Sequence, residues 1–178
     1  GTTLTLGTSG DTIAIPSGVT IANSGTATGF GGANTPAFMA TASAQLTLTN
    51  GASTKVQFNT EVVDTDSDYD TSNYRFTPTT AGKYNVSFSA SMETTGGVGT
   101  ANYAFFKLHK NGSVIHQSYT DSSNNNTYAF GGGVTAIVDM NGSSDYLEAF
   151  VTATASSGAM KVQNTTYTMF SAFKLIGV

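Results

Sequence analysis

Residues 83–93 have the sequence Lys83-Tyr84-Asn85-Val86-Ser87-Phe88-Ser89-Ala90-Ser91-Met92-Glu93, in which apolar and polar side chains alternate throughout. Successive side chains of an extended strand point to opposite faces of a sheet. The apolar members therefore share one face: Tyr84, Val86, Phe88, Ala90 and Met92. One buried and one solvated face are typical of antiparallel sheet. The segment predicts a long strand at the centre of an all-β fold.

Other short β-type runs lie on both sides of this strand, separated by turn residues. They cover residues 37–42, 45–49, 55–59, 74–77, 102–110, 113–119, 127–139, 145–154, 160–163 and 167–176. Between two of them lies Asn111-Gly112. This pair favours a type I′ hairpin turn, which needs a positive φ at both central residues. About ten short strands in this spacing predict a β-sandwich of the antiparallel jelly-roll type.

Composition excludes several classes of function. The chain of 178 residues is only 10% charged and carries a formal net charge of −4, with Arg75 as its single arginine. A nucleic-acid groove needs clustered Lys and Arg, which are missing. No apolar run approaches the roughly 20 residues that span a bilayer, so we expect no membrane insertion. Because the chain begins with Gly1 rather than methionine, we expect it to be part of a longer protein.

The first 35 residues differ from the rest. They contain three short β-type runs separated by Gly-, Ser- and Asn-rich turns: residues 3–6, 12–15 and 19–21. Each run has too few apolar side chains to form a core alone, whereas several intertwined chains would bury them, as in fibre shafts. The chain also lacks cysteine, so its stability must come from something other than disulfides. We therefore interpret residues 1–35 as a β-rich shaft or linker and expect a homotrimer.

The larger part, residues 36–178, carries a series of aromatic residues, one acidic residue and one glycine at fixed spacings: Phe58, Asp64, Tyr69, Phe76, Gly82, Tyr84 and Phe88. In this signature the larger part resembles the globular head of complement component one-q. Val86 stands where that family usually has Phe, on the same face of the strand. The resemblance implies a ten-stranded jelly roll shared with tumour necrosis factor. It further implies a tight trimer at the end of a stalk that binds partners and is not an enzyme.

Residues 4–31 contain runs such as Leu4-Thr5-Leu6-Gly7 and Ile15-Pro16-Ser17-Gly18. In these runs the segment resembles the region that precedes the C-terminal domain in structural proteins of marine bacteriophages. Together the two parts predict a trimeric virion appendage, such as a tail fibre tip, that attaches to the host. Its partners would be other virion structural proteins and a host surface glycan or protein. The alternatives are a trimerisation or capsid-decoration protein that binds no receptor, and a soluble recognition protein of the complement one-q type. Each places the chain on a virion surface or outside the cell.

The acidic segment 64–70 is the one candidate metal site. Asp64, Asp66 and Asp68 stand at alternate positions, as carboxylates do at the start of a calcium loop. A helix–loop–helix calcium hand is excluded, because Tyr69 and Arg75 occupy the positions of its required Gly and Glu. No cofactor is required by the predicted function. Calcium binding and a solvated acidic loop that keeps a sheet edge from aggregating are the two interpretations.

Receptor binding is expected on polar, aromatic loops, because Asn and Tyr bind sugars or proteins without strong charge. The candidates lie in two loops and are Tyr69, Asn124, Asn125, Asn126 and Tyr128. A long solvated hairpin connection is the alternative interpretation of residues 121–128.

Nothing in the sequence favours catalysis. His109 and His116 flank the Asn111-Gly112 turn and would form at most half of a metal site. A glycosidase needs two carboxyl groups in distinct environments. Only three glutamates are present, Glu61, Glu93 and Glu148. The acidic loop could supply the two carboxyl groups, but nothing in the sequence points to a raised pKa. We therefore predict a protein that is not an enzyme.

Overall fold

The computed structural model describes residues 7, 9–20, 22, 24, 34–97, 99–123 and 127–176. The chain divides into two compact units, Gly1–Phe30 and Gly31–Val178. In the first unit, the predicted run 12–15 is described and forms no strand in the single chain, with Ile13 59% exposed. The run 3–6 lies outside the described residues. An intertwined shaft of several chains stays a prediction.

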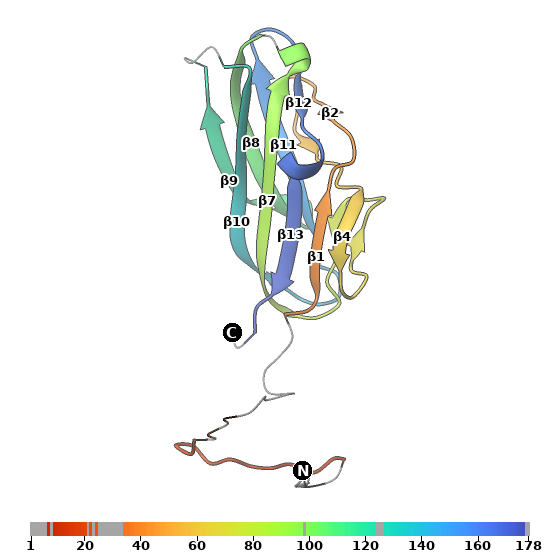
Figure 1. The fold of residues 1–178 in the computed structure, drawn as a ribbon, viewed down its shortest axis with the longest axis vertical. Coiled ribbons are helices and arrows are strands. Elements are labelled where there is room, and N and C mark those ends of the chain that lie inside the picture. The colour runs from red at the N-terminus through yellow and green to blue at the C-terminus, as the bar shows by residue number, and fades with distance from the viewer. Residues whose placement is uncertain are drawn as a thin grey trace. The chain divides into compact units, whose positions relative to one another are not determined.

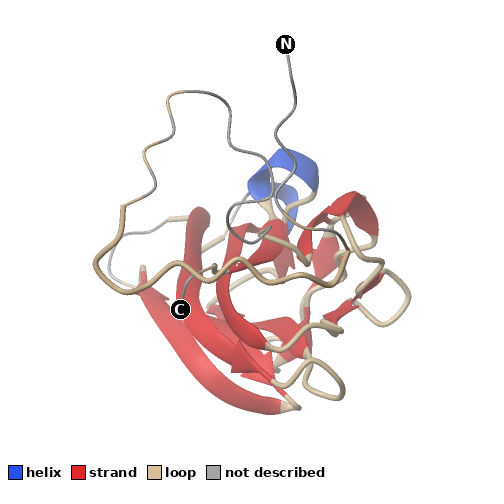
Figure 2. Ribbon diagram, turned by 90° about the horizontal axis from the view of Figure 1, so that it is seen from below, coloured by secondary structure: helices blue, strands red, loops and turns tan. Residues whose placement is uncertain are grey.

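The second unit contains all strands of the described chain, in two antiparallel sheets (Figures 1 and 2). The seven-stranded sheet holds β1 (Ala37–Thr41), β2 (Leu46–Thr47), β4 (Thr60–Asp64), β7 (Gly82–Thr94), β10 (Ala129–Met140), β12 (Met160–Val162) and β13 (Met169–Lys174). The six-stranded sheet holds β3 (Thr54–Lys55), β5 (Tyr69–Asp70), β6 (Arg75–Phe76), β8 (Ala101–Lys110), β9 (Ser113–Asp121) and β11 (Leu147–Ala155). Over the part of the chain that the structure describes, helix is confined to two short 3-10 turns, η1 (Thr95–Gly97) and η2 (Thr165–Tyr167). The predicted all-β jelly-roll class is confirmed.

The alternating segment 83–93 forms the centre of the seven-stranded sheet, within β7. It pairs with β10 along its whole length on one side, and with β13 and β12 on the other. Its even-numbered side chains from Tyr84 to Met92 are buried. The predicted two-residue period is therefore confirmed, and it fixes which face of this sheet meets the core.

Stacked aromatic rings fill the space between the sheets. Phe38 of β1 lies 4.3 Å from Phe76 and 4.7 Å from Tyr69 between ring centroids, and its ring meets the edge of Phe170 at 5.0 Å. Phe58 and Phe88 extend the same cluster with an edge-on contact of 5.9 Å. Aromatic pairs in such geometries add about 0.5–1.5 kcal/mol each beyond their buried area. The signature aromatics thus specify the fold.

Two features differ from the sequence-based expectation. β4 lies where no strand was predicted, because the sequence Thr-Glu-Val-Val-Asp does not alternate between apolar and polar residues. In the structure Thr60 to Val63 are all exposed. Among the described strands β4 pairs with β1 alone, as an edge strand of the seven-stranded sheet. Several other strands are only two or three residues long, so the structure has more strands than the ten expected. No helix in the described residues is long and apolar enough to cross a membrane.

Candidate functional site

The two candidate receptor loops lie at opposite ends of the sandwich. One end is called the proximal end here because the first strand, β1, begins there. β13 ends at the same end, and Thr65 N donates to Ala37 O at 3.0 Å. The loop 64–69 is therefore proximal. At the other end, called distal, β7 ends, and Thr94 N donates to Tyr128 O at 2.8 Å. The loop 121–128 is distal, so one chain cannot combine both loops in a single site.

Two of the three candidate calcium ligands hold backbone N–H groups, Asp64 within the acidic loop and Asp68 in the segment that follows β6. Asp64 accepts hydrogen bonds from the backbone N–H of Asp68 at 3.2 Å and of Tyr69 at 2.9 Å. Asp68 is buried and accepts from the backbone N–H of Thr79 at 3.0 Å. Asp66 is exposed. Among the described residues no cluster of three or more His, Cys, Asp or Glu side chains is arranged for a metal ion. Calcium binding here stays a prediction.

Tyr69 belongs to the core, which corrects its assignment to a receptor surface. Its side chain is only 6% exposed, and its hydroxyl group donates to Phe58 O at 2.8 Å. Burial, followed by the nearby charge of Asp70, raises the pKa of Tyr69. An apolar ring at the start of a two-residue strand gains more free energy in the core than on a loop. We therefore remove Tyr69 from the candidate surface.

In the distal loop, one of the candidate receptor-binding residues is described and exposed to solvent. Tyr128 is exposed, although its backbone carbonyl is tied to β7. The loop begins at a firm anchor, because the buried Ser122 donates from its hydroxyl to Ala101 O at 2.8 Å. Asn124, Asn125 and Asn126 lie outside the described residues. A receptor role for these four residues stays a prediction.

The two histidines lie on opposite faces of the β8–β9 hairpin. A register shift between Leu108 and His109 places His116 opposite Leu108, and Val114 opposite His109. The ring of His109 stacks on Phe150 with centroids 4.1 Å apart. Burial lowers the pKa of His109, so the ring stays neutral at physiological pH. The histidines cannot form half of one metal site.

The glutamates occupy separate places. Glu148 is buried on β11, where its Oε1 accepts from Lys55 at 2.7 Å and from Arg75 at 3.0 Å. Burial alone would raise the pKa of Glu148, but the hydrogen bonds and charges of these two cations outweigh it and lower that pKa. The hydrogen bond from Lys161 lowers the pKa of Glu93. Neither carboxyl group has the raised pKa that a general acid needs at neutral pH.

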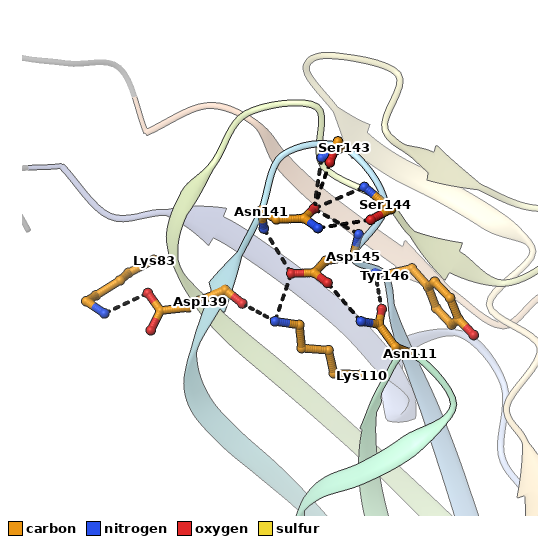
Figure 3. Close-up of polar contacts among 9 residues, drawn as sticks. All are labelled: Lys83, Lys110, Asn111, Asp139, Asn141, Ser143, Ser144, Asp145 and Tyr146. Atoms are coloured by element: carbon orange, nitrogen blue, oxygen red, sulfur yellow. Dashed lines mark hydrogen bonds and ion pairs between the residues drawn. The ribbon is translucent and has the colours of Figure 1, made fainter.

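A polar network ties the proximal end together (Figure 3). The hairpin turn has φ values of +53° at Asn111 and +79° at Gly112, which confirms the predicted type I′ geometry. The Asn111 amide donates to Asp145 at 2.8 Å, and Lys110 forms an ion pair with the same carboxylate at 2.8 Å. These contacts lower the pKa of Asp145 to about 2. Asn141 Oδ1 accepts three backbone N–H groups of the following loop. The network serves to fix these loops.

Exposed apolar side chains gather at two opposite edges of the seven-stranded sheet. β4 forms one edge and exposes Val62 and Val63, with Val62 55% exposed. β10 pairs only with β7 among the described strands and forms the other edge, where Ile137 is 64% exposed. Beside Ile137 an open groove of about 510 Å³ is lined in part by Ile115 and His116 of β9. Sequence reasoning missed both edges.

A third exposed feature lies on the outer face of the six-stranded sheet. Tyr103 and Phe105 of β8 and Tyr119 of β9 bring three rings together there. Aromatic residues at the alternate positions 103 and 105 could have indicated from the sequence that two rings share one face of this strand. Their proximity to Tyr119 depended on the register of the hairpin, which pairs Phe105 with Tyr119.

Comparison with known proteins agrees with this architecture. A family model described as "C1q domain" matches residues 37–175. Among solved structures, the globular domain of zebrafish complement 1qA protein has a TM-score of 0.53 at 15% identity and covers 79% of this chain and 96% of its own. Eiger TNF from S. frugiperda has a TM-score of 0.59 at 10% identity, covering 78% of this chain and 91% of its own. No curated protein matches the chain. At these identities the structural likeness shows the fold alone.

Proposed function

Because this chain belongs to the C1q domain family, we propose that it is the knob of a homotrimeric, non-enzymatic virion appendage that attaches the particle to its host. Domains of this type commonly form homotrimers and are typically recognition or structural modules. The phage-like sequence of residues 4–31 is what directs the proposal to a virion. In the second unit, one set of residues supports the trimer and a different set supports the binding role.

The observation that carries the trimer is the pair of apolar edges. A cyclic trimer needs a heterologous interface, in which one patch of a chain meets a different patch of the next. The edge at Val62 and the edge at Ile137 are two such patches on opposite sides of one sheet. Each side chain would lose most of its contact with water on assembly, which contributes about 1.5–3 kcal/mol per fully buried aliphatic side chain.

Attachment by this knob would depend on avidity. Each trimer presents three copies of the distal loop with Tyr128, and each particle carries several trimers. Weak single sites then combine into strong binding, because later contacts form within an already tethered particle. The fixed loops of the proximal end and the stacked core provide the rigid scaffold that such shallow sites need.

The trimer is tested by light scattering of the purified chain and of two charge variants. We expect the mass of a trimer for the parent, and a smaller species for Ile137→Asp or for Val62→Lys. If the two edges face each other across one interface, the double variant Ile137→Asp/Val62→Lys regains the trimer through a new ion pair. A monomer mass for the parent at micromolar concentration contradicts the proposal.

Attachment is tested by competition. Purified knob added to host cells should reduce adsorption of intact particles, and the trimeric parent should compete far better than a dissociated variant. A folded, trimeric knob that neither binds cells nor competes would favour the alternative of a structural or capsid-decoration protein.

A further inference from the structure

Three aromatic rings form a continuous surface on the outer face of β8 and β9. Ring centroids lie 4.8 Å apart for Phe105 and Tyr119, 5.8 Å for Tyr103 and Phe105, and 5.9 Å for Tyr103 and Tyr119. We call these residues the ring surface. Tyr119 is 52% exposed, and the other two rings are half-buried. The three side chains expose aromatic area that the fold does not use.

The ring surface is distinct from the core. In β8 the neighbouring side chains Ala104, Phe106 and Leu108 are fully buried between the sheets, so Tyr103 and Phe105 must point away from them. Tyr119 stands directly opposite Phe105 on β9 and shares its face. No described segment of the chain packs over these rings with an aromatic contact. The surface therefore faces outward on the six-stranded sheet.

A lysine without an ion pair to a described carboxylate, Lys107, lies at one end of the ring surface. Lys107 Nζ is 5.6 Å from the centroid of Phe105 and donates to Thr152 Oγ1 at 2.8 Å. Within the described part of the chain, Lys107 and Lys174 are the two lysines that form no ion pair with a carboxylate. The hydrogen bond to Thr152 holds the ammonium group next to the rings and leaves its charge unneutralised.

A carboxylate lies at the other end. Asp121 is opposite Tyr103 on β9 and is exposed, with its Oδ1 held by Ser123 N at 2.9 Å and by Ser123 Oγ at 2.6 Å. Tyr103 and Lys107 are four residues apart on β8, and Asp121 lies opposite Tyr103. At about 3.4 Å per residue, the backbone positions of Lys107 and of the Tyr103–Asp121 pair are therefore roughly 14 Å apart along the strands. The rings fill the space between these two opposite charges.

We propose that the ring surface, with Lys107 and Asp121, binds an acidic oligosaccharide whose carboxylate pairs with Lys107. This inference deepens the proposed function, because it gives the host ligand a chemical class and a place on the knob. The apolar C–H face of a sugar ring packs on the electron-rich face of an aromatic ring. Sugar hydroxyl groups donate to Asp121, while the acidic group accepts from Lys107.

The charges at the two ends favour a sugar over an apolar protein patch. A protein that covered the rings closely would take Lys107 and Asp121 out of water, and this desolvation opposes binding unless each charge finds its own partner. An oligosaccharide brings hydroxyl groups and bound water to both ends and covers only the rings. Aromatic side chains with two rotatable bonds also lose little entropy on binding such a ligand.

The binding test uses calorimetry on the trimeric knob with oligogalacturonate, oligoglucuronate and the neutral maltotriose. We expect saturable binding of at least one acidic oligosaccharide, weakened by salt, and much weaker binding of maltotriose. Tyr119→Ala should weaken the acidic ligand roughly three- to tenfold, and Lys107→Gln by about tenfold. Tyr167→Ala and Lys174→Gln are matched controls, since Tyr167 is 63% exposed and Lys174 is the other lysine of the described residues without an ion pair to a carboxylate. Both should leave affinity unchanged.

Two results would overturn the inference. One is no saturable binding of either acidic oligosaccharide. The other is binding that Tyr119→Ala and Lys107→Gln leave at the parent's affinity. Lys107→Gln removes the charge but keeps a flexible polar side chain on the outer face, so it tests the site even if Tyr119→Ala disturbs the strand. Light scattering confirms that each variant is still trimeric.

A cell assay separates this inference from the proposed function. Sugar binding with the expected variant pattern, but no adsorption to host cells, would sustain the site and contradict the attachment role. Adsorption that is unaffected by Tyr119→Ala and Lys107→Gln would sustain attachment and overturn this site as its basis. Adsorption that is lost after protease treatment of the cells, and kept after periodate oxidation of their glycans, would indicate a protein partner and overturn the inference.

Discussion

The hydroxyl group of Tyr69 donates a 2.8 Å hydrogen bond to the backbone carbonyl of Phe58. This bond joins the strand β5 to the segment before β4, and the Tyr69 ring stacks on Phe38 at the same time. Tyr69, at the end of the acidic loop, thus has both its hydroxyl group and its ring in contact with partners inside the core. The loop is held from two directions, by this ring and by the Asp64 carboxylate.

Tyr69→Phe should therefore lower the free energy of unfolding by about 1–3 kcal/mol, because it leaves the Phe58 carbonyl buried without a donor. Tyr69→Ala should cost more, about 3–5 kcal/mol, through the cavity it leaves. Urea unfolding followed by tyrosine fluorescence measures both values. Tyr167→Phe at an exposed position is the control and should change nothing. If Tyr69→Phe is as stable as the parent, the buried hydrogen bond is not formed in solution.

The ion cluster on β11 predicts a pH dependence of stability. The folded-state pKa of Glu148 is lowered, so its contribution is present above the unfolded value of about 4.5 and is lost as pH falls through the folded value. At pH 7, Glu148→Gln should lower the free energy of unfolding by about 1–3 kcal/mol, since Lys55 and Arg75 stay partly solvated. The difference between parent and variant should close at pH well below 4.5. A difference that is independent of pH would contradict the ionic origin.

Gly132 on β10 is required by a close approach. A Cβ built at this position would lie 2.3 Å from the ring of Phe106, so Gly132→Ala should cost about 1–3 kcal/mol through overpacking. Gly131→Ala is the matched control on the same strand, because its Cβ would meet nothing nearer than Ala90 O at 3.4 Å. Thermal unfolding of the two variants side by side measures the difference. Equal melting temperatures would show that the Phe106 ring moves aside at little cost.

Calcium binding at the acidic loop is tested by two variants measured with chelator and with added calcium. In chelator, Asp64→Ala should lose about 1–3 kcal/mol because two backbone N–H groups lose their acceptor, while Asp66→Ala should be near neutral. A calcium site adds a second effect. Calcium should then raise the melting temperature of the parent, and both variants should abolish that rise. Identical parent curves in calcium and in chelator would leave these carboxylates with the structural role alone.

Some features of the molecule followed from local sequence alone. The alternation of Lys83 to Glu93 determined a strand with one buried face, because side chains of extended backbone alternate regardless of context. Asn111-Gly112 determined the hairpin turn, because the two residues adopt positive φ at low cost. The signature aromatics Phe58, Phe76 and Phe88 determined the core, because large rings gain most from burial.

Other features were decided only by the tertiary structure, because they depend on which distant strands pair and in which register. Tyr69 could have faced solvent on a polar loop, and packing against Phe38 placed it inside. A one-residue register shift in the β8–β9 hairpin put His109 and His116 on opposite faces. The same pairing brought Tyr119 beside Phe105, although 13 residues separate them in the chain. Local periodicity specifies the face of each strand, whereas the neighbours on that face come from pairing across the sheet.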